Sequence, residues 1–431
     1  MELFFVAFVV GSAAVLYVCV HYARVRRSQL RCFVGTGADL KRVFSRMATA
    51  RRPPLPPFWA FGSHAQFFPW LIYNVVSELL GPLAFEVQHV RVRGLVDKSK
   101  PEGDANLRRV EDIVLVNYFP AVTGSDTLQL PLDSPAIFID PGLTCTAQDV
   151  PGSSFLRLAV SRGFRVVVME RRGHGRPLAS PRFNLFGDSD DFEQVYDHVR
   201  KQLPLAPFFW IGFSSGSKLV IEGLGKFDER RKRGGAAPTF VAAACVCPGY
   251  NLETCFKGFR FPYTRVCLSS VKSKFLARNA ALLSGFNREV YQAAMSAPDL
   301  QSLLALVPKF AGYPSAESYF RAENPVLFAP QITTPCLIVN SADDPLTVVQ
   351  NAFGTLPGSD GGPTFVEMVE QSPCGMLLIT PSGSHCPFLD GIWWPFATVP
   401  RGLGSLICSS WADRCILEFY EGYLAESSLR S

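Results

Sequence analysis

Short apolar runs alternate with longer helical stretches along most of the chain. The clearest runs are at residues 136–140, 208–213, 335–340 and 376–379, and Gly, Pro, Ser or Asp follows each of them closely. Runs of this length are typical of strands that are covered on both faces. Their alternation with helices predicts an α/β fold with a mostly parallel, doubly wound sheet.

The first residues carry a different pattern. Leu3 to Val20 form an almost unbroken apolar stretch of 18 residues, close to the ~20 that a helix needs to cross a bilayer. Glu2 precedes the stretch and a basic, aromatic flank at 21–27 follows it, whereas a cleaved signal peptide carries its positive charge in front. The pattern therefore predicts an uncleaved single-pass membrane anchor within residues 1–27.

Basic residues after this anchor predict its orientation. They are Arg24, Arg26, Arg27, Arg31 and Lys41. Because positively charged flanks tend to stay in the cytosol, the rest of the chain is expected there, held at the endoplasmic reticulum or another endomembrane. The 12 cysteines are spread singly, without the spacing of a secreted disulfide framework, which agrees with this compartment.

Composition sets the size of the core and excludes one class of partner. The chain has 431 residues, of which 48% are hydrophobic, enough for a large core in one domain or two. The net charge of +5 is modest, and basic residues are scattered or confined to short runs such as 230–233. No nucleic-acid-binding surface is predicted, and no cysteine–histidine spacing predicts a metal site.

Residues 208–224 have the order of a nucleophile elbow. An apolar strand leads into Gly-x-Ser-x-Gly at Gly212, Ser214 and Gly216, and a helical stretch follows. Such a strained turn between strand and helix exposes the serine hydroxyl. The two glycines stand where a Cβ would collide with the neighbouring strand or helix. Ser214 is therefore the candidate nucleophile.

A serine attacks well only when a base accepts its proton. In hydrolases with this elbow, an acid and a histidine follow the serine in that order. Among the six histidines, only His385 is C-terminal to Ser214. Asp343 and Asp344 follow a predicted strand where the acid should lie. Asp344 is preferred because the Pro345 turn follows it directly; Asp343 is the alternative, and the other aspartate is expected to cap the turn.

Backbone amides are the expected oxyanion donors. The run at 136–140 ends in a Gly-containing turn, and the residue after the serine offers a second amide. The N–H groups of Leu143 and Ser215 are the predicted pair.

Several further motifs are spread over most of residues 53–424. They are the Pro-rich 53–59, 62–66, Pro141-Gly142-Leu143-Thr144, 163–168 with Arg171-Arg172-Gly173, 180–182 with 190–192, and Tyr313, 317–320 and 342–345. Together with the nucleophile elbow, these motifs resemble the YheT-like branch of the α/β-hydrolases, which includes membrane-anchored ABHD lipases and phospholipases. Pro141 stands where the family usually has His, and Ser384 and Pro387 replace glycines of its Gly-Gly-His-x-Gly loop.

The resemblance implies an α/β-hydrolase fold with a helical cap insertion. The implied enzyme is an esterase acting on lipid or acyl esters through Ser214, an aspartate and His385. The implied organisation is an anchor at 1–27, a lead-in with the first strands at 28–110, a first core part at 111–254, the cap at 255–330 and a last core part at 331–431. A lipid ester and the bilayer are the expected partners, and no cofactor or metal is required.

Three functions are open at this point. The first is ester hydrolysis through an acyl-enzyme on Ser214. The second is acyl transfer or thioester hydrolysis by the same residues, and the third is a non-catalytic membrane interaction protein. Ser214, an aspartate and His385 in the expected order favour the hydrolase, whereas the departure at Pro141 keeps the third open. Local patterns encode neither the lipid nor its chain length.

Overall fold

The computed structural model describes residues 11–57 (apart from 14, 18, 21, 22, 25 and 26), 60, 62–68, 85–95, 98, 109–122, 130–149, 153–255, 262–354, 362–391 and 410–428. Among them, no helix is long and apolar enough to cross a membrane. Residues 3–10 of the predicted anchor lie outside the described residues. The anchor and the domain boundaries therefore stay predictions.

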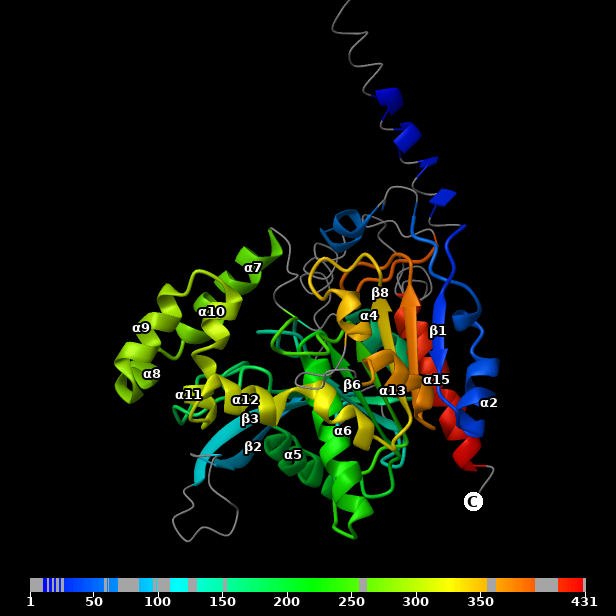
Figure 1. Cartoon of the computed structure of the whole chain (residues 1–431). Coiled ribbons are helices and arrows are strands. Elements are labelled where there is room, and N and C mark those ends of the chain that lie inside the picture. The colour runs from blue at the N-terminus through cyan, green and yellow to red at the C-terminus, as the bar shows by residue number, and fades with distance from the viewer. Residues whose placement is uncertain are drawn as a thin grey trace, which may run out of the picture.

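A mixed sheet forms the centre of the described structure (Figure 1). Its strands are β1 (Arg31–Val34), β2 (Glu86–Leu95), β3 (Arg109–Phe119), β4 (Ala136–Asp140), β5 (Arg165–Glu170), β6 (Phe208–Phe213), β7 (Ala242–Val246), β8 (Cys336–Ser341) and β9 (Gly375–Thr380). They lie in the order β1-β9-β8-β7-β6-β4-β5-β3-β2. Strands β4 to β9 run parallel, whereas β1, β2 and β3 pair antiparallel with their neighbours. The predicted mostly parallel sheet is confirmed.

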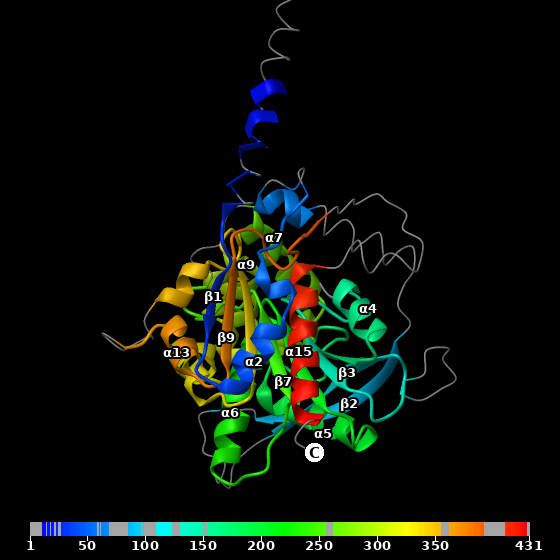
Figure 2. The ribbon, with the colours of Figure 1, turned by 90° about the vertical axis from the view of Figure 1, so that its right-hand side faces the viewer.

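Helices cover both faces of this sheet (Figure 2). One face carries α2 (Ala38–Arg46), α4 (Ser153–Ser161) and α15 (Trp411–Ser428), and the other carries α5 (Ser189–Gln202), α6 (Gly216–Lys232) and α13 (Phe365–Gln371). In β6, the ring of Phe209 lies 4.6 Å from that of Tyr420 on α15, and Trp210 stacks on Phe192 of α5 at 3.8 Å. Successive side chains of a strand point to opposite faces, so the unbroken apolar run of β6 is buried on both.

Between β7 and β8 the described chain is helical. It contains α7 (Tyr263–Ser270), a π-helical turn (Val271–Leu276), α8 (Ala280–Phe286), α9 (Arg288–Ser296), α10 (Leu300–Leu304), α11 (Val307–Ala311) and α12 (Ala316–Glu323). We call α7–α12 the cap. Figure 1 shows the cap beside the sheet, on the side away from α2 and α15. Its apolar side chains form a cluster of their own, which also takes in Phe183 and Leu185 of the segment before α5.

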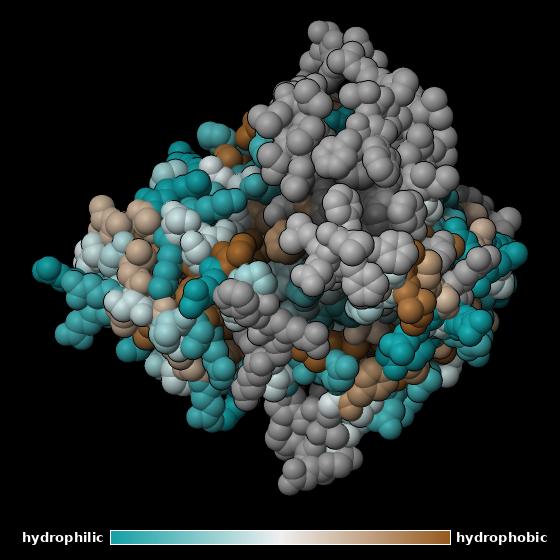
Figure 3. Space-filling model, turned by 90° about the horizontal axis from the view of Figure 1, so that it is seen from above, coloured by the Kyte–Doolittle hydropathy of each residue, from teal (hydrophilic) through white to brown (hydrophobic). Residues whose placement is uncertain are grey.

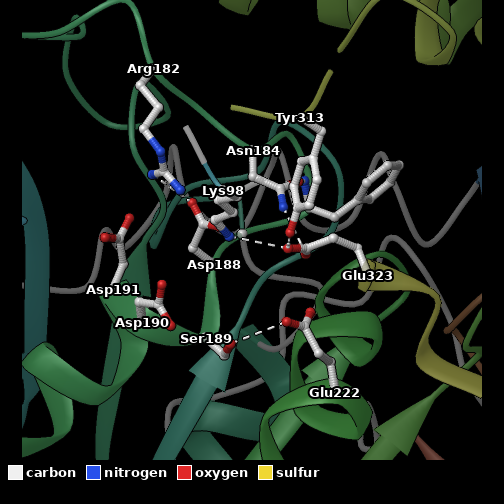
Figure 4. A network of polar contacts seen from close by, with 12 residues as sticks. Lys98, Arg182, Asn184, Asp188, Ser189, Asp190, Asp191, Glu222, Tyr313 and Glu323 are labelled. Atoms are coloured by element: carbon white, nitrogen blue, oxygen red, sulfur yellow. Dashed lines mark hydrogen bonds and ion pairs between the residues drawn. The ribbon is translucent and has the colours of Figure 1, made fainter. Parts of the chain in front are cut away.

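A buried ion pair joins the cap to α6, and Figure 4 shows the polar network around it, in which Lys98 and Tyr313 point toward Glu323. Glu323, at the end of α12, is fully buried and accepts hydrogen bonds from Asn184 at 2.9 Å, from Lys98 at 3.1 Å, and from Tyr313 and Lys218. Burial raises the pKa of Glu323, but the charges of Lys218 and Lys98 outweigh this effect and hold that pKa well below its usual range. Since Lys218 lies on α6, one ionised carboxylate of the cap is bound to the helix that follows Ser214.

Candidate active site

The nucleophile elbow lies at the carboxyl end of β6. The strand ends at Phe213, Ser214 has a φ of +53°, and α6 begins at Gly216. A positive φ is uncommon for a residue with a Cβ and is typical of a strained functional turn. The Ser214 N–H donates to the Val246 carbonyl at 2.8 Å, which ties the turn to β7. The Ser214 residue itself is only half-buried.

Close packing explains both glycines of the elbow motif. A Cβ on Gly212 would lie 2.6 Å from the carbonyl carbon of Gly216, and a Cβ on Gly216 would lie 2.1 Å from the carbonyl oxygen of Asp140. Both obstacles are backbone atoms, which cannot rotate away as a side chain can. The collisions expected from the sequence are confirmed.

Turns after β6, β8 and β9 bring Ser214, Asp344 and His385 together. His385 Nε2 lies 2.7 Å from Ser214 Oγ. His385 Nδ1 lies 2.8 Å and 3.0 Å from the two carboxylate oxygens of Asp344. The three strands are parallel, so their carboxyl ends meet at one edge of the sheet. This is the order of contacts that a serine, a base and an orienting acid require.

Asp344 is held rigidly on its turn. Its carboxylate accepts from the N–H groups of Leu346 and Thr347 at 2.8 Å and 3.0 Å, and from the Thr347 hydroxyl at 2.7 Å. The side chains of Asp344 and His385 are both buried. These contacts fix the carboxylate in the direction of the imidazole.

Asp343 has a different set of contacts. It accepts from the N–H groups of Gly383 and Ser384 at 3.0 Å and 2.9 Å, and from the Ser382 hydroxyl at 3.1 Å. It makes no hydrogen bond to His385. The sequence predicted that the second aspartate would cap its own turn. Asp343 does more than that, because it also holds the loop that carries His385.

The charge of Asp344 sets the protonation behaviour of His385. Burial lowers the pKa of His385, but the charge of Asp344 and its hydrogen bond outweigh burial and raise that pKa above its ordinary value. An imidazolium at this position is thus stabilised. The arrangement favours transfer of the Ser214 proton to His385 Nε2 when the serine attacks.

One group of potential metal ligands adjoins the triad in the described part of the chain. The Sγ atoms of Cys247 and Cys386 and a ring nitrogen of His385 lie within 4.8 Å of one another. Both ring nitrogens of His385 already contact Ser214 and Asp344. A metal ion at this position would compete with Ser214 or Asp344 for a ring nitrogen of His385.

A small cavity of about 50 Å³ lies beside Ser214. It is lined by Leu143, Phe186, Ser214, Ser215, Lys218, Gly249, Leu252, Cys255, Cys267, Pro325, Leu346 and Thr347. Most of this lining is apolar, and Cys267 belongs to the cap. From above, hydrophobic residues gather near the middle of the visible face (Figure 3). The cavity can hold an apolar group next to the serine hydroxyl.

Leu143 and Ser215, the predicted oxyanion donors, both line the cavity beside Ser214. Within the described structure, neither backbone N–H donates to a protein acceptor. Both residues therefore lie beside Ser214, and their role as oxyanion donors stays a prediction.

The sequence motifs predicted no role for two residues that lie near Ser214. Lys218 lines the cavity, with its ammonium paired to Glu222 and Glu323. Arg171 donates to carbonyls of the turn that carries Leu143. Their proximity depends on pairing between distant segments, although Arg171 does lie in an Arg-Arg-Gly turn directly after a predicted strand.

The profile of the alpha/beta hydrolase family matches residues 136–391, more than half of the chain. The chain belongs to that family.

Among curated proteins, the chain is similar to phospholipase ABHD3 of Homo sapiens, 28% identical over 268 residues that cover 60% of each protein. It is also similar to monoacylglycerol lipase ABHD2 of Homo sapiens, 24% identical over 67% of this chain and 65% of that protein. Among solved structures, the esterase Est1E of Butyrivibrio proteoclasticus is 13% identical over 64% of this chain and 88% of its own, with a TM-score of 0.38. The matches thus span less than two thirds of either human protein.

Proposed function

We propose that this chain is a serine hydrolase that cleaves carboxylic esters of lipids through an acyl-enzyme on Ser214. One observation carries the proposal: a half-buried serine hydroxyl, in contact with a histidine–aspartate pair, opens onto a largely apolar cavity. A cavity of this character suits an acyl chain better than a polar group. The similarity to a phospholipase and a monoacylglycerol lipase supports an acylglycerol or phospholipid as substrate.

The proposed reaction proceeds in two acyl-transfer steps. Ser214 Oγ attacks the ester carbonyl carbon while its proton passes to His385 Nε2, and the oxyanion faces the amides of Leu143 and Ser215. The ester C–O bond then breaks, the departing alcohol takes the proton from His385, and the acyl chain stays on Ser214. Water repeats the sequence and releases a fatty acid. Asp344 stabilises the imidazolium throughout.

The proposal includes attachment to a membrane. The apolar stretch from Leu3 to Val20 and the basic flank after it support a single-pass anchor. An enzyme held at an endomembrane, with its catalytic part in the cytosol, would meet lipids that stay in the bilayer. Protease protection of intact membranes tests the orientation: the catalytic part should be digested without detergent.

A panel of lipid esters in mixed micelles tests the substrate class. Diacyl phospholipids, lysophospholipids and monoacylglycerols of matched chain length are incubated with the wild-type chain and with Ser214→Ala. Release of free fatty acid by the wild type alone supports the proposal. If added alcohol diverts the acyl group into a new ester without free acid, the chain is an acyltransferase. If the folded wild type consumes no ester at all, the hydrolase proposal fails.

A further inference from the structure

Arg171 is the first residue after β5, and its guanidinium reaches the turn that follows β4. Its Nη2 donates to the carbonyl oxygens of Gly142 and Pro141 at 2.5 Å and 3.0 Å. Its Nη1 lies 3.5 Å from the Ser215 hydroxyl. One side chain thus contacts both segments that carry the expected oxyanion donors.

Stability alone explains this arginine poorly. Arg171 is 2% exposed, and it forms no ion pair with any described carboxylate. Burial lowers its pKa, which the charge of Asp140 opposes. A buried cation without a paired anion usually costs free energy. The contacts that offset this cost are its hydrogen bonds to the turn at Pro141 and Gly142.

The geometry of the peptide unit links those hydrogen bonds to the oxyanion hole. In a planar trans peptide, the C=O of one residue and the N–H of the next point in opposite directions. The Gly142 carbonyl accepts from Arg171 and also from the Cys145 N–H at 3.2 Å, so the Leu143 N–H is directed to the opposite side of this peptide. Leu143 lines the cavity, and a Cβ built on Gly142 would lie only 3.8 Å from Ser214 Cβ. Both observations place this peptide close to the nucleophile, and the Leu143 N–H donates to no acceptor within the described structure.

We propose that Arg171 is a positioning residue of the oxyanion hole, which fixes the Gly142–Leu143 peptide so that its N–H meets the developing oxyanion. The inference rests on the proposed hydrolase function and adds a residue to it. Arg171 does not touch the substrate. It acts through the backbone of Leu143, so its loss should weaken binding of the transition state and leave binding of the substrate unchanged.

The adjacent arginine supplies a matched control. Arg172 is equally buried, at 2% exposed, but it forms a bidentate ion pair with Asp191 at 2.6 Å and 2.8 Å. Its contacts lead to α5 and away from Ser214. Replacing Arg172 removes a buried arginine from the same turn without releasing the Gly142–Leu143 peptide.

The experiment compares Arg171→Met and Arg171→Lys with Arg172→Met and Arg172→Lys. For each variant, kcat and KM are measured with a short p-nitrophenyl ester, together with inhibition by a trifluoromethyl ketone, whose adduct with Ser214 carries an oxyanion. Thermal melting reports folding. Misplacing an oxyanion donor costs about 10²-fold. Arg171→Met should therefore lose about that factor in kcat and in ketone affinity, with KM within about twofold, and Arg171→Lys should lose less.

Folded Arg172 variants should keep both kcat and ketone affinity within about threefold of the wild type. The inference is wrong if folded Arg171 variants keep kcat, or if they lose ketone affinity no more than their Arg172 counterparts. Should Arg171→Met not fold, the two lysine variants decide by the same comparison. A folded wild type that hydrolyses no ester overturns the hydrolase function and this inference together, whereas an active wild type with unaffected Arg171 variants overturns only the inference.

Discussion

The triad and the cap differ in how the chain builds them. Ser214, Asp344 and His385 lie on turns after parallel strands, so the sheet sets their spacing. The cap lies outside the sheet, and a buried carboxylate, Glu323, ties it to α6 through Lys218. The proposed reaction depends on the first region, and the second contributes Cys267 to the cavity beside Ser214. We therefore expect substitutions in the triad to abolish turnover and substitutions in the cap to change stability and chain-length preference.

The largest effect is expected at the nucleophile. Ser214→Ala should lower kcat for any ester by at least about 10⁴-fold, because no acyl-enzyme can form. The melting temperature should change little, since Ser214 is half-buried and its hydroxyl hydrogen-bonds, among the described residues, only to His385. Activity of a purified sample and a thermal melt measure the two quantities. Full activity in Ser214→Ala would place the reaction elsewhere.

The adjacent aspartates offer the next comparison. Asp344→Asn should lower kcat by about 10⁴-fold, because the amide cannot stabilise the imidazolium of His385. Asp343→Asn should lower it by no more than about 10²-fold, because it disturbs only the placement of the histidine loop. Steady-state kinetics of both variants separates the roles. Equal losses would contradict the assignment of Asp344 as the acid.

The pH dependence of kcat/KM tests the contact between Asp344 and His385. His385 must be neutral to accept the Ser214 proton, so kcat/KM should fall as the pH is lowered through the pKa of His385. Asp344 raises that pKa, so the midpoint should lie above the ~6.5 of an unperturbed histidine. In Asp344→Asn the remaining activity should have its midpoint at lower pH. A midpoint that does not move would show that Asp344 does not raise the pKa of His385.

The junction between cap and core should affect stability rather than chemistry. Glu323→Gln leaves Lys98 and Lys218 buried with one charge partner fewer, and breaking such a pair costs about 3–5 kcal/mol. Glu317→Gln, on the same helix, removes an exposed pair with Arg321 and should have little effect on unfolding. Urea unfolding of both variants measures the difference. If both unfold like the wild type, the buried pairs do not hold the cap.

The smallest effect is expected at the cavity wall. Cys267→Phe on α7 should reduce the space beside Ser214 and lower kcat/KM for long-chain esters roughly 10-fold more than for acetyl esters. Val266→Phe changes the neighbouring residue, which is 58% exposed, and should leave the ratio unchanged. A chain-length series with each variant tests this. An unchanged ratio in Cys267→Phe would exclude this part of the cavity from acyl binding.

Much of the core could be predicted because its signals are local. The apolar runs of β4, β6, β8 and β9 are buried on both faces, and the Gly-x-Ser-x-Gly turn places Gly216 where a Cβ would collide with the Asp140 carbonyl. Because the base follows the serine and the acid along the chain, His385 was the only candidate for it. These inferences need no knowledge of contacts between distant segments.

Other features depend on contacts that no local pattern encodes. Asp343 and Asp344 are neighbours after the same strand, and only the path of the turn decides which carboxylate meets His385. Arg171 reaches Gly142 because β4 and β5 pair side by side. Glu323 gathers Lys98, Asn184 and Lys218 from three distant parts of the chain. Such buried polar groups are recognised only once the fold brings them together.

The central claim is that Ser214 is an activated nucleophile, and fluorophosphonate labelling tests it most directly. The wild-type chain, Ser214→Ala and His385→Ala are treated with the probe, and the modified peptide is identified by mass spectrometry. We predict that the wild type is labelled on Ser214 and that neither variant is labelled. A folded wild type that takes up no label, or a Ser214→Ala variant that is still labelled, would contradict the account.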